Sequence, residues 1–190
     1  MEPSAVPLRE RNRRRVRREI RDVALARFVA DGYAETSVEQ IAAAAGVSMS
    51  TFFRHFPTKE DVVFAGHDVT VAALRSALAQ QSPGPPLAQV RAALTAVQFA
   101  AIDDAGARAV AQLIDRTPAL QARNLQLSQD LEAVVAEHLG GAGLPPVGAR
   151  LQAGALFGAL RAARGLAAER GDLGAAALVD AVFDLLGATQ

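Results

Sequence analysis

The sequence predicts an all-α protein of about nine helices. Apolar residues recur at intervals of three and four along most of the chain, as they do on one face of a helix. Clusters of glycine and proline separate these segments, and none shows the strict alternation that is typical of a strand. With 190 residues, of which 51% are hydrophobic, the chain can bury a sizeable core in one or two domains.

The first helix is expected to begin near residue 13. Its apolar side chains recur three or four residues apart and form one buried stripe that ends before Gly32. The members of this stripe are Val16, Ile20, Val23, Ala24 and Phe28. Residues 1–12 contain two prolines and no apolar periodicity, so we expect them to form a disordered basic arm.

Arginine is concentrated at this end of the chain. Although the net charge is +0, eight arginines lie between Arg9 and Arg21, against two glutamates. Such a cluster can neutralise phosphates in a salt-dependent way, and its first part could enter the minor groove of DNA as an arm. Arg15 and Arg18 are our candidates for DNA contacts. The alternative is a solvated start of the first helix, because charge runs at chain ends are common.

Residues 36–55 have the pattern of two short helices joined by a tight turn. Thr36 or Ser37 can cap the first helix, with Glu or Gln three residues later completing a capping box. Gly46 is placed to end that helix in the left-handed conformation, and Ser48 can cap the second. The second helix is too short to be stable alone, so its apolar residues anchor it and its polar residues are free. This pattern indicates a helix-turn-helix, an element that reads DNA.

A third helix follows the motif. Pro57 stops the preceding helix, Thr58 can cap the next one, and Lys59 falls in its first turn. A cation there opposes the helix dipole unless an anion lies nearby. A DNA phosphate would be such an anion.

These residues together resemble a known family. Ala-Gly-Val-Ser at residues 45–48 and the run from Thr51 to Glu60 are similar to the DNA-binding domain of TetR/AcrR-family regulators. Upstream, residues 18–28 and Gly32-Tyr33 resemble the first helix of that domain and its exit, so the resemblance covers about residues 14–66.

The resemblance implies that the second helix of the motif enters the major groove, with residues 48–51 near base edges and phosphates. Phe53 stands where members usually carry a tyrosine whose hydroxyl reaches a phosphate, and Met49-Ser50 stand where a lysine-glycine pair is common. The candidates for DNA contact are Arg15, Arg18, Thr36, Ser37, Ser48, Met49, Ser50, Thr51, Phe53, Arg54, His55 and Lys59.

We expect residues 13–66 to form the helix-turn-helix domain, and residues 67–190 to form a helical domain for effector binding and dimerisation. One long helix over residues 59–81 is expected to lead out of the first domain and to end at the proline-rich loop 82–86. Further helices are expected over residues 87–102, 105–114, 118–139, 147–169 and 173–186.

The last two helices carry many small and apolar residues, which permit close approach of another helix. Pairing them with their copies would give a four-helix interface, and TetR-like regulators are two-fold dimers built in this way. A dimer would present two recognition helices about 34 Å apart, which implies a palindromic operator in double-stranded DNA. The alternative is an ordinary alanine-rich core.

The resemblance also implies an effector pocket among the middle helices, although each apolar candidate could equally be a core residue. Residues 51–63 and 117–123 are similar to a subgroup with an acyl-CoA-like ligand-binding domain, which suggests a long-chain acyl-CoA or similar amphipathic anion. An uncharged hydrophobic drug or metabolite is the competing ligand class. The candidates are Phe99, Leu113, Arg116, Leu120, Arg123, Leu127, Phe157 and Arg161.

Other functional classes find little support. Cysteine is absent, and no apolar run reaches the length of about 18 residues that a membrane helix needs, so a cytoplasmic protein without a membrane partner is expected. The three histidines lack metal-ligand spacing and the glycine-rich stretches lack a P-loop lysine, so we predict no catalytic, metal or cofactor site. A DNA-binding regulator or architectural protein without an effector is the alternative function.

Overall fold

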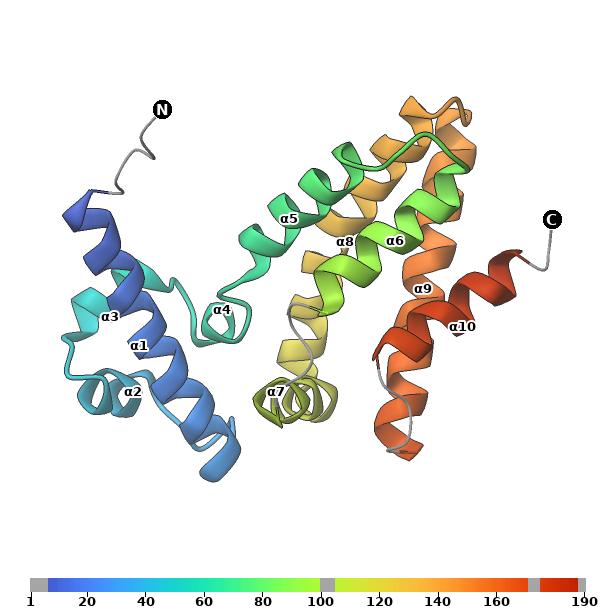
Figure 1. Ribbon diagram of the computed structural model, residues 1–190. Coiled ribbons are helices and arrows are strands. Elements are labelled where there is room, and N and C mark those ends of the chain that lie inside the picture. The colour runs from blue at the N-terminus through green and yellow to red at the C-terminus, as the bar shows by residue number, and fades with distance from the viewer. Residues whose placement is uncertain (1–6, 100–104, 171–174, 188–190) are drawn as a thin grey trace. The chain divides into compact units, whose positions relative to one another are not determined.

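Figure 1 shows the computed structural model, which describes residues 7–99, 105–170 and 175–187. All regular structure in these ranges is helical, so the all-α prediction is confirmed. The chain forms two compact units, residues 1–65 and 66–190. Unit 1 contains α1 (Leu8–Ala30), α2 (Val38–Ala44), α3 (Met49–His55) and α4 (Lys59–Val63). Unit 2 contains α5 (His67–Ala79), α6 (Pro86–Phe99), α7 (Ala105–Arg116), α8 (Pro118–Gly141), α9 (Pro146–Arg170) and α10 (Ala175–Gly187).

The core of unit 1 is built on the apolar stripe of α1. This helix contacts α2 and α4, and α2 contacts α3. Because α2 and α3 have only 7 residues each, they depend on tertiary packing for their stability. Burying one large apolar side chain contributes roughly 1.5–3 kcal/mol. The largest fully buried side chains of the unit are Ile20, Phe28, Ile41, Phe52, Phe56 and Val62.

The first helix begins at Leu8, earlier than the sequence pattern indicated. Its N-terminal turns carry ion pairs at four-residue spacing, Arg14 with Glu10 and Arg15 with Glu19. Such pairs support a helix even where apolar periodicity is missing. The prediction of a disordered arm is therefore wrong for residues 8–12, and residues 1–6 of that arm lie outside the described residues.

The turn between α2 and α3 fixes how the two helices follow one another. Ser37, and not Thr36, is the N-cap of α2 and forms the capping box with Gln40. After α2, Gly46 adopts a φ of 65°, in the left-handed region. The Val47 N–H then donates to the Ala42 carbonyl oxygen at 2.9 Å, which closes the turn.

The single helix predicted over residues 59–81 is instead two helices. Helix α4 ends at Val63, and Gly66 is the N-cap of α5. Phe64 has already left helical geometry, with φ −100° and ψ 23°. The prediction was wrong because apolar periodicity continues across this break, while glycine favours non-helical backbone there.

Unit 2 is a helical bundle around α8, which contacts α5, α6, α7 and α9 (Figure 1). Helix α10 packs against α6 and α9. Arg91 on α6 also pairs with Asp180 at 2.7 Å and Asp184 at 3.3 Å, both on α10. No helix in the described ranges is both long and apolar enough to cross a membrane. The buried core includes Leu74, Val90, Val135, Leu139, Leu156 and Val182.

Substituting Gly46 tests the turn. A Cβ at this position would meet no atom within 4 Å, so the cost of Gly46→Ala is conformational and not steric. We expect a loss of about 1–2 kcal/mol in the free energy of unfolding, measured by urea denaturation followed by circular dichroism. Gly46→Asn is the matched control and should lose less, because asparagine tolerates the left-handed region. Equal losses for the two variants would contradict this explanation.

Candidate nucleic-acid interface

Helix α3 presents one exposed face. Phe52 is fully buried and anchors the helix, while Ser50, Phe53 and Arg54 are exposed. These three residues follow the i, i+3, i+4 spacing and therefore share one side of the helix. Met49 and Thr51 are partly exposed beside them. A short helix with a buried anchor and a free face is the arrangement that a DNA-reading helix requires.

The first turn of α3 is held by Ser48. The Ser48 hydroxyl accepts the Thr51 N–H at 3.1 Å and donates to the Thr51 hydroxyl at 3.0 Å. The cap satisfies one N–H that would otherwise lack an intrahelical partner. The Thr51 hydroxyl still has its own hydrogen to donate, so it can contact a phosphate or base edge.

Phe53 is an apolar residue in an exposed position. Its exposed fraction is 47%, and its ring packs edge-on against Phe52 with centroids 5.5 Å apart. Without a hydroxyl it offers no hydrogen bond to a phosphate. Its ring can instead make apolar contacts, for example with the methyl group of thymine in the major groove.

Lys59 has a structural role that the sequence did not reveal. Its ammonium donates to the carbonyl oxygens of Tyr33 at 2.7 Å and Thr36 at 3.2 Å, and it lies 4.1 Å from the Tyr33 ring centroid. These carbonyl groups, and not only a DNA phosphate, offset the unfavourable position of the cation in the first turn of α4. Two of the three ammonium donors are thus used within the fold.

Tyr33 and Glu60 complete this cluster. The Tyr33 hydroxyl donates to Glu60 Oε1 at 2.5 Å. Burial and the hydrogen bond to Glu60 raise the pKa of Tyr33. Burial opposes ionisation of Glu60, but hydrogen bonds from Tyr33, its own backbone and Thr58, with the charge of Lys59, outweigh it and lower the Glu60 pKa. The cluster ties α4 to the loop between α1 and α2, and neither Tyr33 nor Glu60 was among the predicted site residues.

Thr36 and Ser37, both predicted to contact DNA, use their hydroxyl groups within the fold. Thr36 is 1% exposed and its hydroxyl donates to the Gly32 carbonyl oxygen at 2.7 Å, so its side chain cannot reach DNA in this conformation. The hydroxyl closes the turn before α2, which leaves the main chain of Thr36 for the predicted DNA contact. Ser37 is partly exposed, and its hydroxyl is used in the capping box.

An arginine that was not a candidate secures α3. Arg17 donates to the His55 carbonyl oxygen at 2.6 Å and to the Ala65 carbonyl oxygen at 3.5 Å. Its guanidinium carbon lies 4.4 Å from the Phe56 ring centroid. Of the predicted arginines, Arg15 pairs with Glu19, while Arg18 is exposed.

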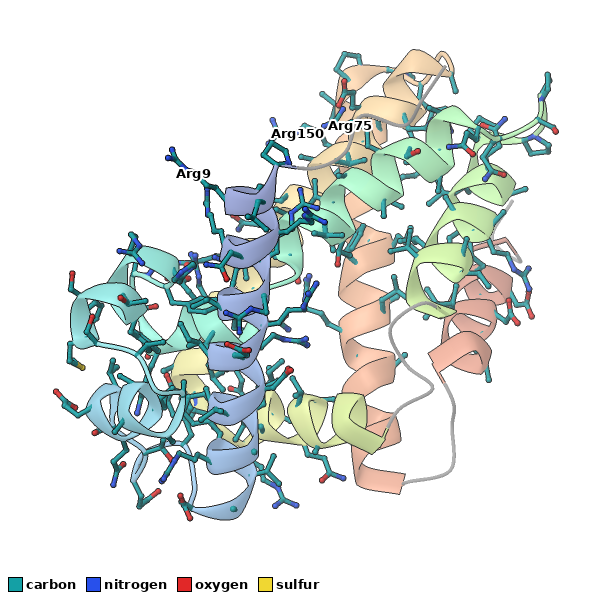
Figure 2. All side chains as sticks on the ribbon, turned by 60° about the vertical axis from the view of Figure 1, so that its left-hand side comes forward. Arg9, Arg75 and Arg150 are labelled. Carbon is teal, nitrogen blue, oxygen red and sulfur yellow. The ribbon has the colours of Figure 1, made fainter. Side chains whose placement is uncertain are left out.

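An open groove of about 660 Å³ lies between the N-terminal turns of α1 and the C-terminal end of α3. Figure 2 shows Arg9 extending away from the N-terminal end of α1. The groove is lined by Arg9, Asn12, Arg13, Val16, Arg54 and His55.

His55 forms part of the wall of this groove and is only 8% exposed. Burial lowers the pKa of its imidazole, and the positive charges of Arg54, Arg13 and Arg17 lower it further. The ring is therefore neutral near pH 7, because its ordinary value of 6.5 is already below that pH. Any DNA contact by His55 would be made inside the groove and not from the exposed face of α3.

The predicted effector residues lie on four helices of unit 2. Leu120 is fully buried and Phe157 is 5% exposed, so both pack in the interior. Leu113 and Leu127 are partly exposed, and Phe99 ends α6 with its side chain outside the described residues. Arg116 and Arg161 are exposed. Arg123 donates to Gln126 Oε1 at 3.4 Å. These residues form a dispersed set on helices that pack in pairs, α7 with α8 and α8 with α9.

Helix α9 exposes large apolar residues in unit 2. Val147 is 71% and Leu151 is 69% exposed, and the four-residue spacing puts them on one face. Ala155 continues that face and is also exposed. On α10, Leu185 is 67% exposed. Large apolar side chains gathered on a surface are typical of interaction sites.

Comparison with known proteins covers both units. Residues 20–65 match the family model of bacterial regulatory proteins of the tetR family, and residues 84–190 match the model of the MftR C-terminal domain. The second match alone spans more than half of the chain.

Two curated relatives are similar to parts of this chain. One is the HTH-type transcriptional regulator TcmR of Streptomyces glaucescens, 37% identical over 142 residues. The other is the putative mycofactocin biosynthesis transcriptional regulator MftR of Mycobacterium tuberculosis, 31% identical over 122 residues. These matches cover 70% and 62% of this chain, which spans only 63% and 61% of the relatives' lengths.

A solved structure shares the fold. FadR from Bacillus subtilis in complex with stearoyl-CoA superposes with a TM-score of 0.64 at 20% sequence identity, covering 88% of this chain and 96% of that one. At this identity the similarity concerns the fold alone. The two family models, by contrast, match the DNA-binding unit and the greater part of unit 2 separately. The chain therefore belongs to the TetR family of bacterial regulatory proteins.

Proposed function

We propose that this chain is a ligand-responsive transcriptional repressor that binds a palindromic operator as a dimer and is released by a small effector. The observation that carries this proposal is α3, a capped helix anchored by a buried Phe52 whose opposite face is exposed. Placed in the major groove, that face would bring Ser50, Phe53 and Arg54 to base edges and phosphates. Because its partner is DNA, we place the protein in the cytoplasm.

We infer that dimerisation uses α9 and α10. The exposed apolar residues Val147, Leu151 and Leu185 support this, because a second copy would remove them from water. A two-fold dimer would present one α3 to each half of a palindromic site. Exclusion of RNA polymerase from the bound DNA would then repress transcription.

We propose an acyl-CoA or a similar amphipathic anion as the effector. The exposed guanidinium groups of Arg116 and Arg161 in unit 2 suit a phosphate or carboxylate. FadR, which has the same fold, accommodates stearoyl-CoA. The effector would weaken DNA binding by stabilising a dimer conformation whose two α3 helices no longer fit successive major grooves.

Substitution of Thr51 and Lys59 separates DNA contact from folding. Duplexes selected by the wild-type protein from a random library would supply the DNA. Thr51→Ala should weaken binding roughly tenfold in fluorescence anisotropy with little change in urea stability, since the Ser48 cap keeps the Thr51 backbone N–H and loses only an exposed hydrogen bond to the Thr51 hydroxyl. Lys59→Ala should lose about 2 kcal/mol of unfolding free energy, because the Tyr33 and Thr36 carbonyl groups lose their donor. Failure to select any duplex would refute the proposed function.

Substitution of Leu151 tests the dimer. Leu151→Glu places a charge on the exposed apolar face of α9, and we expect a monomer at micromolar concentration in sedimentation velocity. Leu125→Glu is the matched control, because Leu125 is 48% exposed and lies on α8, which is not one of the two helices of the proposed interface. A wild-type monomer, or dissociation by both variants, would contradict the assignment.

An acyl-CoA series tests the effector. Release of the protein from its selected duplex should strengthen with chain length until the pocket is filled, by roughly 0.8 kcal/mol per buried CH2 group. Free coenzyme A is the control and should release little, because it lacks the apolar chain. Absence of release across the series would reject this ligand class and leave the DNA-binding function standing.

A further inference from the structure

The arginines of α1 have different partners on different faces of the helix. Arg9, Arg13 and Arg17 lie four residues apart and form one stripe directed at the C-terminal end of α3. Arg14 and Arg15 lie off this stripe and pair with glutamates of the same helix.

Within the stripe, the three guanidinium groups have different surroundings. Arg17 is held by the His55 and Ala65 carbonyl oxygens and by the Phe56 ring. Arg9 and Arg13 are exposed and line the groove, where Arg54 approaches from α3. In the described part of the chain, none of these three groove arginines has an acidic partner within salt-bridge distance.

The groove is therefore a concentration of positive charge, and Glu10, which interacts with the charge of Arg13, is itself paired with Arg14. Burial is the main cause of the lowered pKa of His55, and the charges of Arg54, Arg13 and Arg17 add to it by disfavouring a further positive charge there. An anion bound between Arg9, Arg13 and Arg54 would relieve this repulsion. Guanidinium groups bind phosphate oxygens through two parallel hydrogen bonds, so a phosphate suits the site.

The position of Arg54 indicates that the bound phosphate would belong to the DNA backbone. Arg54 shares the exposed face of α3 with Ser50 and Phe53 and also lines the groove, so the two surfaces are continuous. A helix lying in a major groove about 12 Å wide has the sugar-phosphate backbone at both edges. A backbone phosphate beside the C-terminal end of α3 would then lie near the groove.

We propose that the groove formed by Arg9, Arg13 and Arg54 binds a phosphate of the DNA backbone. The site deepens the proposed function and rests on it. Arg9 and Arg13 lie in the N-terminal turns of α1, upstream of residues 20–65, which the tetR-family model matches. Each subunit of a dimer would carry one such site.

The salt dependence of DNA binding tests the proposal. The logarithm of the binding constant falls linearly with the logarithm of salt concentration, and each phosphate that the protein neutralises adds about 0.9 to the magnitude of the slope. For a dimer, the double variant Arg9→Ala/Arg13→Ala should lower this magnitude by about 2 and the affinity at least about tenfold. The probe is the duplex selected by the wild-type protein, measured by anisotropy over a series of NaCl concentrations.

The matched control is Arg14→Ala/Arg21→Ala, which removes the same charge from exposed positions that do not line the groove. It should change the slope by much less. Equal changes in the two doubles, or an unchanged slope in the groove double, would overturn the proposal while wild-type binding kept the proposed function. Failure of the wild type to bind any duplex would overturn both.

The pKa of the His55 imidazole tests the proposal in the wild-type protein, without any substitution. In NMR titrations, the pKa of His55 should rise when the wild-type protein binds its duplex, because a phosphate offsets the arginine charges. His67 and His138 lie in unit 2 and serve as internal references. An unchanged His55 pKa on DNA would overturn the proposal. So would an equal rise with micromolar inorganic phosphate alone, since the groove would then be a site for free anions.

Discussion

Two cations bound to main-chain carbonyl groups hold the DNA-binding unit together. Lys59 donates to the carbonyl oxygens of Tyr33 and Thr36, and Arg17 donates to that of His55 at the end of α3. The His55 carbonyl group lies at the end of α3, where carbonyl groups have no intrahelical partner, and those of Tyr33 and Thr36 lie in the loop between α1 and α2. With these donors in place, the helices that flank the turn at Gly46 can be brief and still fixed in orientation. The exposed face of α3 depends on this arrangement.

Arginine has three different roles along α1, and the face of the helix on which each arginine lies determines its role. Arg17 is turned into the unit and stabilises it, Arg14 and Arg15 pair with glutamates on the helix surface, and Arg9 and Arg13 line the groove. The zero net charge of the chain conceals this sorting. Local charge density, and not the net charge of the chain, determines where an anion can bind.

Local features of the fold could be predicted from the sequence, because their causes lie within a few residues. The cap at Ser48, the turn at Gly46 and the buried stripe of α1 are of this kind. The burial of the Thr36 side chain was not predicted, since burial is set by residues distant in sequence. The groove escaped prediction for the same reason: Arg9 and Arg54 meet only in the folded unit. In unit 2, apolar periodicity marks interior residues without separating a packed core from the wall of a ligand site.

Phe53 and the basic groove both bear on how α3 would be held against DNA. A tyrosine at position 53 would add a hydrogen bond to a phosphate, whereas the exposed ring of Phe53 can add only apolar contact. Arg54 follows Phe53 directly in α3, and together with Arg9 and Arg13 of α1 it supplies charged donors in the groove. A charge-assisted contact is stronger than a neutral one and more sensitive to salt. In the proposed complex, Arg9 and Arg13 of α1 would compensate for the hydroxyl that Phe53 lacks and would shift affinity toward electrostatics, while base readout would rest on the few side chains on the exposed face of α3.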